Sequence, residues 1–229
     1  MKKNTIAIGD IHGRNNWKRI VEEHPNDRIV FLGDYCDPYE EMKNSDVLSN
    51  LLDIIDLKTK RKDDIILLLG NHDMHYLYEN FTVGTRFNQS IAELIKDLFE
   101  ERREYFQFAY QEDNILYTHA GVSNLWWSKY FKGMTGEGAP SIAEQLNNPT
   151  DELFKVMCLV GFNRGGCCEC GGIFWAGAEE TRNDPLQGMC QVVGHSQMKG
   201  VQTVVQSEDT SITYCDCLRN DEYYTHDEQ

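Results

Sequence analysis

The chain has 229 residues, a formal net charge of −15 and 41% hydrophobic residues, which is enough apolar material for the core of one large domain. It contains no apolar run of about eighteen residues, so a membrane-spanning helix is excluded. The acidic charge disfavours nucleic-acid partners, because clustered Lys and Arg bind phosphate backbones. A site for an anionic substrate would therefore need local positive charge from metal ions or a few arginines.

The apolar stretch near the N-terminus is too short for a signal peptide, and we therefore expect a cytoplasmic protein. In that compartment the eight cysteines are expected as reduced thiols rather than disulfides. Cys36, Cys158 and Cys190 lie in apolar surroundings that are typical of small core residues.

The first half of the chain alternates short apolar runs with segments of helical periodicity. Residues 5–9, 28–32 and 64–69 predict buried strands, and residues 15–23 and 46–57 between them predict helices. Uniformly apolar strands joined by helices are typical of a parallel sheet with helices packed on its outside. We therefore predict an α/β protein.

The second half is less regular. Its expected elements are a helix at 89–101, a hairpin of 106–110 with 115–118, helices at 141–146 and 152–160, a Gly- and Cys-rich loop at 161–172, and strands at 191–194, 201–206 and 211–215. No linker or repeat divides the chain, so we expect a single domain over residues 1–219. The polar, acidic residues 220–229 predict an unordered C-terminal tail.

Polar motifs stand at the ends of five predicted strands. They read Gly9-Asp10-Ile11-His12-Gly13, Gly33-Asp34-Tyr35-Cys36-Asp37, Gly70-Asn71-His72-Asp73, His119-Ala120-Gly121 and Gly194-His195-Ser196. The carboxyl ends of strands in open parallel sheets are where ligands bind, and glycine lets the backbone turn sharply there. Carboxylates, imidazoles and an amide together form a ligand set for divalent metal ions.

This ordered set of motifs resembles the calcineurin-like metallophosphoesterases, in particular the phosphoprotein (serine/threonine) phosphatases and their bacterial and phage relatives. The motifs run from Gly9 to His195, so the resemblance covers most of the chain. It implies a sandwich of two mixed β-sheets flanked by helices, in four αββα layers. It also implies a site for two divalent metal ions, with Asp10 and His12 on the first ion, Asp34 bridging both, and Asn71, His119 and His195 on the second.

The chemistry that the resemblance implies is in-line attack on a phosphate ester by a hydroxide held between the metals. Two adjacent ions lower the pKa of bound water and hold the attacking and leaving oxygens. His72 resembles the family's general acid, and Asp37 would orient it and favour its protonated form. The ligand set favours Mn²⁺, accepts Fe²⁺, Zn²⁺ or Co²⁺ as well, and disfavours two Mg²⁺ ions.

The residues that would hold the substrate phosphate are less clearly marked. The phosphoprotein phosphatases carry an arginine directly after the residue that matches Asp37, and this chain has Pro38 there. Arg14, next to Gly13, and Arg164, within a glycine-rich segment, are the candidates that we expect to replace it. Arg182 is a third option, although a solvated surface position explains it better.

A cluster of cysteines offers a second possible metal site. Cys167 and Cys170 form a Cys-x-x-Cys half-site for zinc, and Cys215 with Cys217 could complete four thiolates. The Cys-x-Cys spacing suits a tetrahedral ion poorly and no histidine supports it. A structural zinc is therefore disfavoured, and reduced thiols in a loop near the site are the preferred interpretation.

The leading hypothesis is a metal-dependent phosphatase acting on phosphate monoesters, either phosphoserine and phosphothreonine in proteins or a small phosphate ester. A nucleotide or dinucleoside-polyphosphate hydrolase is the enzymatic alternative. A catalytically silent binding scaffold is a third possibility, and it is disfavoured because all six ligands, His72 and Asp37 are present. Metal identity, substrate and oligomeric state are left open by the sequence.

Overall fold

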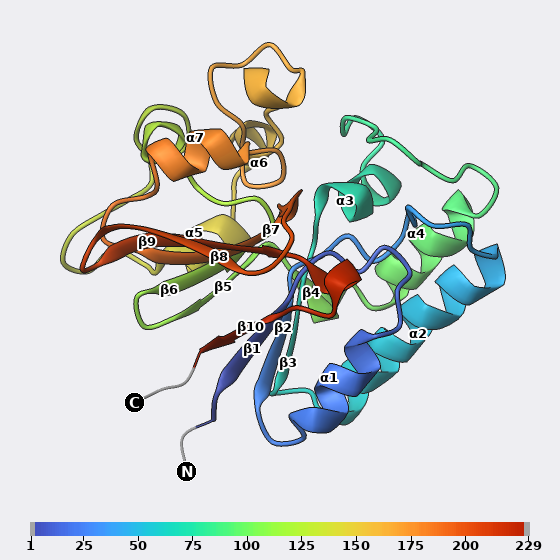
Figure 1. Ribbon diagram of the computed structural model, residues 1–229. Helices are drawn as coiled ribbons and strands as arrows, with labels where there is room; N and C mark the ends of the chain where they lie inside the picture. The colour runs from blue at the N-terminus through green and yellow to red at the C-terminus, as the bar shows by residue number, and fades with distance from the viewer. Residues whose placement is uncertain (1–2, 227–229) are drawn as a thin grey trace.

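The computed structural model describes residues 3–226 and contains two mixed five-stranded sheets flanked by helices (Figure 1). This arrangement confirms the predicted α/β sandwich. Helices α1, α2 and α4 lie along the first sheet, and α5, α6 and α7 accompany the second (Figure 1). None of the helices within residues 3–226 is long and apolar enough to cross a membrane.

The first sheet has the strand order β10-β1-β2-β3-β4, in which β1 to β4 are parallel and β10 is antiparallel to β1. Its elements are β1 (Thr5–Ile8), β2 (Arg28–Phe31), β3 (Ile65–Leu68), β4 (Phe106–Gln107) and β10 (Tyr224–His226), with helices α1 (Trp17–Glu23) and α2 (Asn44–Lys60) in the first two crossovers. The three predicted strands and two predicted helices of the first half are thus confirmed, as is their parallel arrangement.

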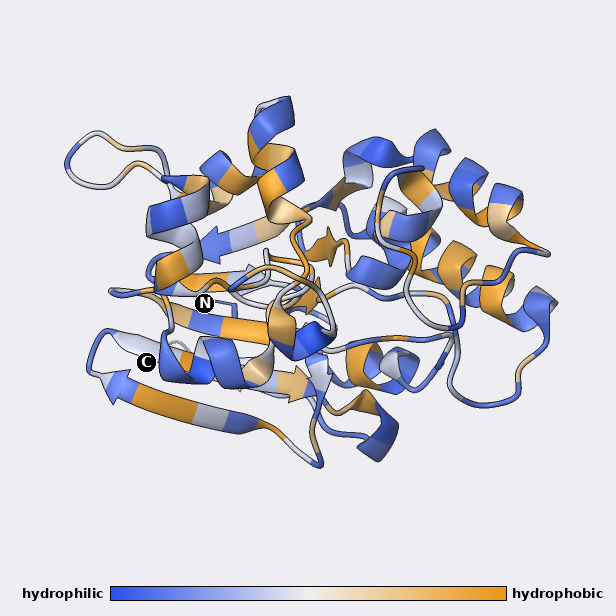
Figure 2. Ribbon diagram, turned by 90° about the horizontal axis from the view of Figure 1, so that it is seen from above, coloured by the Kyte–Doolittle hydropathy of each residue, from blue (hydrophilic) through white to orange (hydrophobic). Residues whose placement is uncertain are grey.

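Both faces of this sheet are covered, which explains why its strands show no polar alternation. Ile6, Ile29 and Phe31 point to the helices and belong to the main hydrophobic cluster. Alternate residues such as Val30 and Leu68 point to the other side, where they share a cluster with residues of the second sheet. Figure 2 shows hydrophobic positions gathered on the central strands, whereas the surrounding helices alternate hydrophobic and hydrophilic residues.

The second sheet has the order β5-β6-β7-β9-β8, with parallel pairs in its centre and antiparallel pairs at both edges. Its strands are β5 (Ala109–Glu112), β6 (Ile115–Thr118), β7 (Cys190–Gln197), β8 (Gln202–Ser207) and β9 (Thr210–Asp216). The predicted hairpin is correct for β5 and β6 but wrong at its start, because Phe106 and Gln107 pair with β3 in the first sheet. The chain passes from one sheet to the other at Phe108.

The remaining elements are short. They are α3 (Asn71–Leu77), α4 (Ala92–Glu101), α5 (Ile142–Asn147), α6 (Asp151–Met157) and α7 (Ala178–Asn183), the 3-10 turns Arg103–Tyr105, Phe162–Arg164 and Leu218–Asn220, and a π-helical segment at Trp126–Phe131. Helices α4, α5 and α6 were predicted within a few residues. Helices α3 and α7 were not, because helices of seven and six residues show too little periodicity.

The expectation of an unordered tail is wrong for the part of it that the structure describes. Tyr224–His226 form strand β10, in which His226 pairs with Thr5 and Tyr224 with Ala7. Backbone hydrogen bonds to β1 order this polar segment without any apolar periodicity in its side chains. Residues 227–229 of the expected tail lie outside the described residues.

Candidate metal centre

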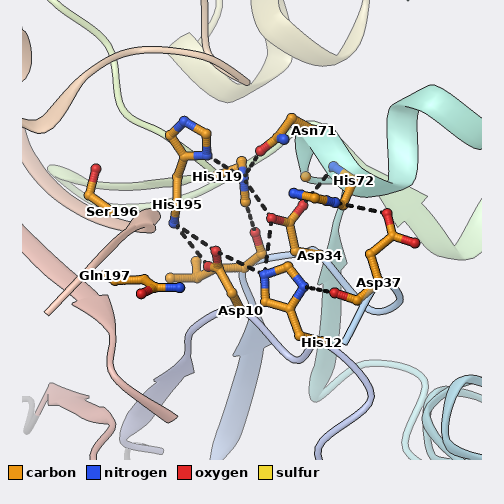
Figure 3. A network of polar contacts seen from close by, with 12 residues as sticks. Asp10, His12, Asp34, Asp37, Asn71, His72, His119, His195, Ser196 and Gln197 are labelled. Carbon is orange, nitrogen blue, oxygen red and sulfur yellow. Dashed lines mark hydrogen bonds and ion pairs between the residues drawn. The ribbon is translucent and has the colours of Figure 1, made fainter. Parts of the chain in front are cut away.

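The six residues expected to bind metal come together at the strand ends. Asp10 and His12 follow β1, Asp34 follows β2, and Asn71 begins α3 directly after β3. From the second sheet, His119 follows β6 and His195 lies within β7. Figure 3 shows these side chains pointing toward one another from both sheets.

His12 presents an unprotonated nitrogen to two carboxylates. Its Nδ1 donates to the carbonyl oxygens of Cys36 and Asp37 at 2.9 and 3.0 Å, so the lone pair is on Nε2. That Nε2 lies 3.9 Å from Asp10 Oδ2 and 3.7 Å from Asp34 Oδ2. Burial lowers the pKa of His12 to about 4 and keeps the ring neutral. A histidine held through its second nitrogen by a carbonyl is the usual arrangement of a metal ligand.

His119 is held in the same way from the other sheet. Its Nδ1 donates to the carbonyl oxygen of Leu32 at 2.8 Å, and its Nε2 lies 2.9 Å from Asn71 Oδ1 and 3.2 Å from His195 Nδ1. Burial lowers the pKa values of both His119 and His195. The lone pair of a neutral His119 thus faces an amide oxygen, an arrangement that a cation between them would stabilise.

Asp34 stands between these two groups. Its Oδ1 accepts a hydrogen bond from the backbone N–H of His72 at 2.9 Å, while its Oδ2 lies 3.7 Å from His12 Nε2 and 3.5 Å from His119 Nε2. Burial alone would raise the pKa of Asp34, but the surrounding histidines, His119 first, lower it. Two groups that could each hold an ion, Asp10–His12–Asp34 and Asp34–His119–His195, therefore share one carboxylate.

A further buried acid, Asp216, was not recognised from the sequence. It ends β9 beside Asp10, and burial together with the charge of Asp34 raises its pKa to about 6. Burial, then Asp216 and Asp34, raise the pKa of Asp10 as well. Three buried carboxylates repel one another unless cations compensate them, and the residues present therefore fit a centre of divalent ions. The available signal in the sequence was an acid at the end of the predicted strand 211–215, between Cys215 and Cys217.

The turns that present these side chains have unusual backbone geometry. His12, Asp34, Asp37 and His195 adopt left-handed conformations, with φ of 45°, 54°, 59° and 60°. Such conformations cost energy in residues other than glycine and gather at functional sites. A side chain at Gly194 would place its Cβ 2.2 Å from Asp10 Oδ1, so the close approach of the β7 backbone requires glycine there.

Asp73 connects two of these turns through hydrogen bonds. Its carboxylate accepts hydrogen bonds from the backbone N–H groups of Asp34 at 2.7 Å, Tyr35 at 2.9 Å and Gly70 at 2.8 Å. It is fully buried. The turns that carry Asp34 and Asn71 are thereby held in one geometry. Asp73 belongs to the third sequence motif, which does not by itself indicate this role.

The expected pair of His72 and Asp37 is also formed. His72 Nδ1 lies 2.8 Å from Asp37 Oδ2. Burial opposes protonation of His72, but Asp34 and then Asp37 raise its pKa above the ordinary value. Asp37 has two more partners that we had not anticipated, His75 and Tyr76. The signal for His75 was its spacing of three residues from His72, which places both on one side of α3.

A cavity of about 580 Å³ opens over these groups. It is lined by Asp10, His12, Asp34, Asn71, His72 and His195, by Tyr39, by residues 82–85, 158–160 and 164–168, and by Trp175. Five of the six metal-ligand candidates, all except His119, therefore face the same space as His72. A phosphate ester in this cavity would meet the candidate ligands and the candidate acid together.

The structure separates the two arginines that we expected to hold phosphate. Arg164 lines this cavity and donates to Ser196 Oγ. Arg14 instead lines a neighbouring cavity, where it pairs with Glu40 at 3.0 Å and donates to the backbone carbonyl oxygen of Asp10 at 3.4 Å. Arg182 is exposed and lies 5.7 Å from the ring of Tyr214.

The cysteines lie in three surroundings. Cys158, Cys167 and Cys168 line the cavity. Cys170 belongs to the main hydrophobic cluster, whereas Cys215 and Cys217 belong to the cluster between the sheets. The thiols considered for a four-cysteine site are therefore placed in different parts of the molecule. Cys36 is buried as expected, and Cys158 and Cys190 are half-buried.

Comparisons with known proteins agree with this geometry. The family model of calcineurin-like phosphoesterases matches residues 3–187. Among solved structures, a cold-active protein-tyrosine phosphatase of a psychrophilic Shewanella is similar with a TM-score of 0.59 and 16% identity, over 95% of this chain and 72% of that one. A protein serine/threonine phosphatase from Saccharomyces cerevisiae has a TM-score of 0.53 and 16% identity, over 93% and 66%.

At these identities the two structures establish a shared fold alone. No curated protein matches the sequence. The family match spans most of the chain and includes four of the five motifs, and the structure adds the fold and two candidate ligand groups that share Asp34. The chain belongs to the calcineurin-like phosphoesterases, a family that acts on phosphate esters with a dinuclear metal centre.

Proposed function

We propose that the protein is a phosphatase that hydrolyses phosphate monoesters with the help of two divalent metal ions. The observation that carries this proposal is the approach of two neutral imidazole nitrogens, His12 Nε2 and His119 Nε2, to the same Asp34 oxygen at 3.7 and 3.5 Å. In this proposal Asp10 and His12 hold the first ion, Asp34 is shared, and Asn71, His119 and His195 hold the second. When bound, the ions would lower the pKa of a water molecule and offset the negative charge of the phosphate.

The side chains around the ligands have distinct tasks. His72 donates its Nε2 proton to the leaving-group oxygen while the bond from phosphorus to that oxygen breaks. Asp37 accepts a hydrogen bond from His72 Nδ1–H at 2.8 Å and so fixes the ring with Nε2 directed to the substrate. Arg164 holds a phosphate oxygen, since its guanidinium lines the cavity and carries several donors.

The substrate class follows from this arrangement in part. One arginine and two ions suit a single phosphoryl group, and we therefore propose monoesters, including phosphorylated side chains of proteins. The two similar structures are of protein phosphatases, which makes phosphopeptides natural test substrates. Mn²⁺ is our first choice of ion, because oxygen and imidazole ligands suit it, while Fe²⁺, Zn²⁺ and Co²⁺ accept the same set.

The test is an activity panel with the Mn²⁺-loaded protein. It includes phosphoserine, phosphothreonine and phosphotyrosine peptides, p-nitrophenyl phosphate, alkyl phosphates, nucleotides and dinucleoside polyphosphates. We expect turnover of monoesters and two ions per chain by metal analysis. Preference for dinucleoside polyphosphates would instead favour a nucleotide hydrolase. Absence of turnover, together with fewer than two ions, would contradict the proposal.

A further inference from the structure

One wall of the cavity is a loop that follows helix α3. We call residues 82–88 the pocket loop. Its first four residues line the cavity. Gly84 lies directly beside the candidate acid, because a Cβ built on it would be 3.5 Å from His72 Cε1 and 3.6 Å from His72 Nε2.

Behind His72, the carboxylate of Asp37 has a partner on each oxygen. His72 Nδ1 hydrogen-bonds Oδ2 at 2.8 Å, and the Tyr76 hydroxyl donates to Oδ1. His75 Nε2 also lies 2.8 Å from Oδ2, as a close polar contact without hydrogen-bond geometry. His75 and Tyr76 are buried in α3. Asp37 is therefore held as a carboxylate in one orientation.

The pocket loop is bonded to both of these additional partners. The backbone N–H of Gly84 donates to His75 Nδ1 at 3.2 Å, so the proton of a neutral His75 is on Nε2, the nitrogen that lies 2.8 Å from Asp37 Oδ2. The backbone N–H of Asn88 donates to the Tyr76 hydroxyl at 3.0 Å. Between these two bonds, the ring of Phe87 packs against His75 and Tyr76, with centroids 4.9 and 4.8 Å apart.

The same loop also reaches the turn that carries Asp37. Arg86 donates to the carbonyl oxygen of Pro38 at 3.5 Å, and its guanidinium lies 4.3 Å from the centroid of the Tyr39 ring. Tyr39 packs edge-on against His12 at 4.7 Å and lines the cavity. The pocket loop thus contacts Tyr39, which lines the cavity, and also His75 and Tyr76, which contact Asp37 behind His72.

We propose that His75 and Tyr76 are positioning residues that fix Asp37, and through it His72, and that the pocket loop keeps both in place. This inference depends on the proposed role of His72 as the proton donor. Without the Tyr76 hydroxyl, Oδ1 of Asp37 loses its partner and the carboxylate is free to rotate away from His72. The metal-ligand candidates keep all their contacts in that case, so the loss falls on proton donation.

The experiment compares two substrates that differ in their need for an acid. In Tyr76→Phe, turnover of an alkyl phosphate should fall about tenfold, since general acids contribute 10²- to 10⁴-fold and mispositioning removes part of this. Turnover of p-nitrophenyl phosphate should fall less than about twofold, because p-nitrophenolate leaves without a proton. Tyr78→Phe is the matched control, as its hydroxyl, two residues further on, contacts Arg103 at 3.2 Å and should affect neither substrate.

A second pair of variants distinguishes a loss of proton donation from a folding defect. His75→Phe should show the same selective loss, and His75→Gln, which keeps a donor, should restore part of the alkyl phosphate turnover. Metal content and melting temperature are measured for each variant. An equal fall on both substrates, or an unchanged ratio in folded and metal-loaded Tyr76→Phe and His75→Phe, would overturn the inference. Failure of the proposed function is distinguishable, since the unaltered protein would then hydrolyse neither substrate.

Discussion

The two candidate ligand groups are built in different ways. Asp10, His12 and Asp34 all follow neighbouring strands of one sheet, and their turns are bonded to each other, with His12 N–H donating to the Asp34 carbonyl at 2.7 Å. His119 and His195 come from the other sheet and meet Asp34 across the boundary between the sheets.

Two contacts hold that boundary at the site. His119 Nδ1 donates to Leu32 of the first sheet, and the backbone N–H of His195 donates to Asp10 Oδ1 at 2.9 Å. The first group is therefore a local product of two turns, whereas the second depends on how the sheets pack, through the cluster that includes Val30 and Val192. Asp34 belongs both to the group formed by two adjacent turns and to the group formed where the two sheets pack.

Asp34→Asn should give the largest effect, because it alters both groups at once. We expect weaker binding of both ions and a fall in kcat/KM on the order of 10³-fold, as several kcal/mol of transition-state stabilisation are lost. Asp10→Asn, which alters the first group alone, should leave the second ion in place. Metal analysis and phosphatase assays of both variants measure the difference. If Asp34→Asn kept either ion at the original affinity, the two groups would not share this residue.

The metal-free protein offers a comparison of His12 in the first group with the nearby acid Asp216. The pKa of His12 falls from 6.5 to about 4 in the folded state. The unfolded chain thus binds more protons between these values, and stability falls by about 3 kcal/mol as pH drops from 6.5 to 4. The pKa of Asp216 rises from 3.8 to about 6, so its contribution has the opposite sign and a similar size over about the same range.

These two contributions should nearly cancel in the unaltered metal-free protein. His12→Asn should therefore become more stable relative to it as pH falls from 6.5 to 4, and Asp216→Asn less stable. Denaturant unfolding at several pH values with a chelator present measures both slopes. A His12→Asn variant with the same pH dependence as the unaltered protein would show that His12 is not held neutral by burial.

The local group was predictable from the sequence for a physical reason. A parallel strand that ends in Gly-Asp or Gly-Asn fixes where the next side chains lie, so the motifs after β1, β2 and β3 indicated both fold and ligands. The six ligand candidates and the pair of His72 and Asp37 are brought together as expected.

What the sequence did not indicate depends on contacts between distant segments. Asp73 bonds the turn of Asp34 and Tyr35, which are 39 and 38 residues away in the chain, and Asp216 faces the still more distant Asp10 and Asp34. The split of the expected hairpin at Phe108 likewise depends on pairing with β3, which no local pattern records. Arg14, which we expected to contact phosphate because it lies beside Gly13, likewise pairs with a residue 26 positions away, Glu40.

The smallest expected effect is on KM and distinguishes Arg14, in the first half of the chain, from Arg164, in the second half. Arg164 lies in the loop of the second half and lines the cavity, while Arg14 follows the first turn and faces a different cavity. Arg164→Met should raise KM for p-nitrophenyl phosphate about tenfold and weaken inhibition by inorganic phosphate similarly, since a charged hydrogen bond is worth about 1.5 kcal/mol or more. Arg14→Met should change KM less than about twofold. If Arg14→Met raised KM more than Arg164→Met did, Arg14 would be the residue that contacts the phosphate. The second half of the chain would then supply metal ligands but no arginine contact to the substrate.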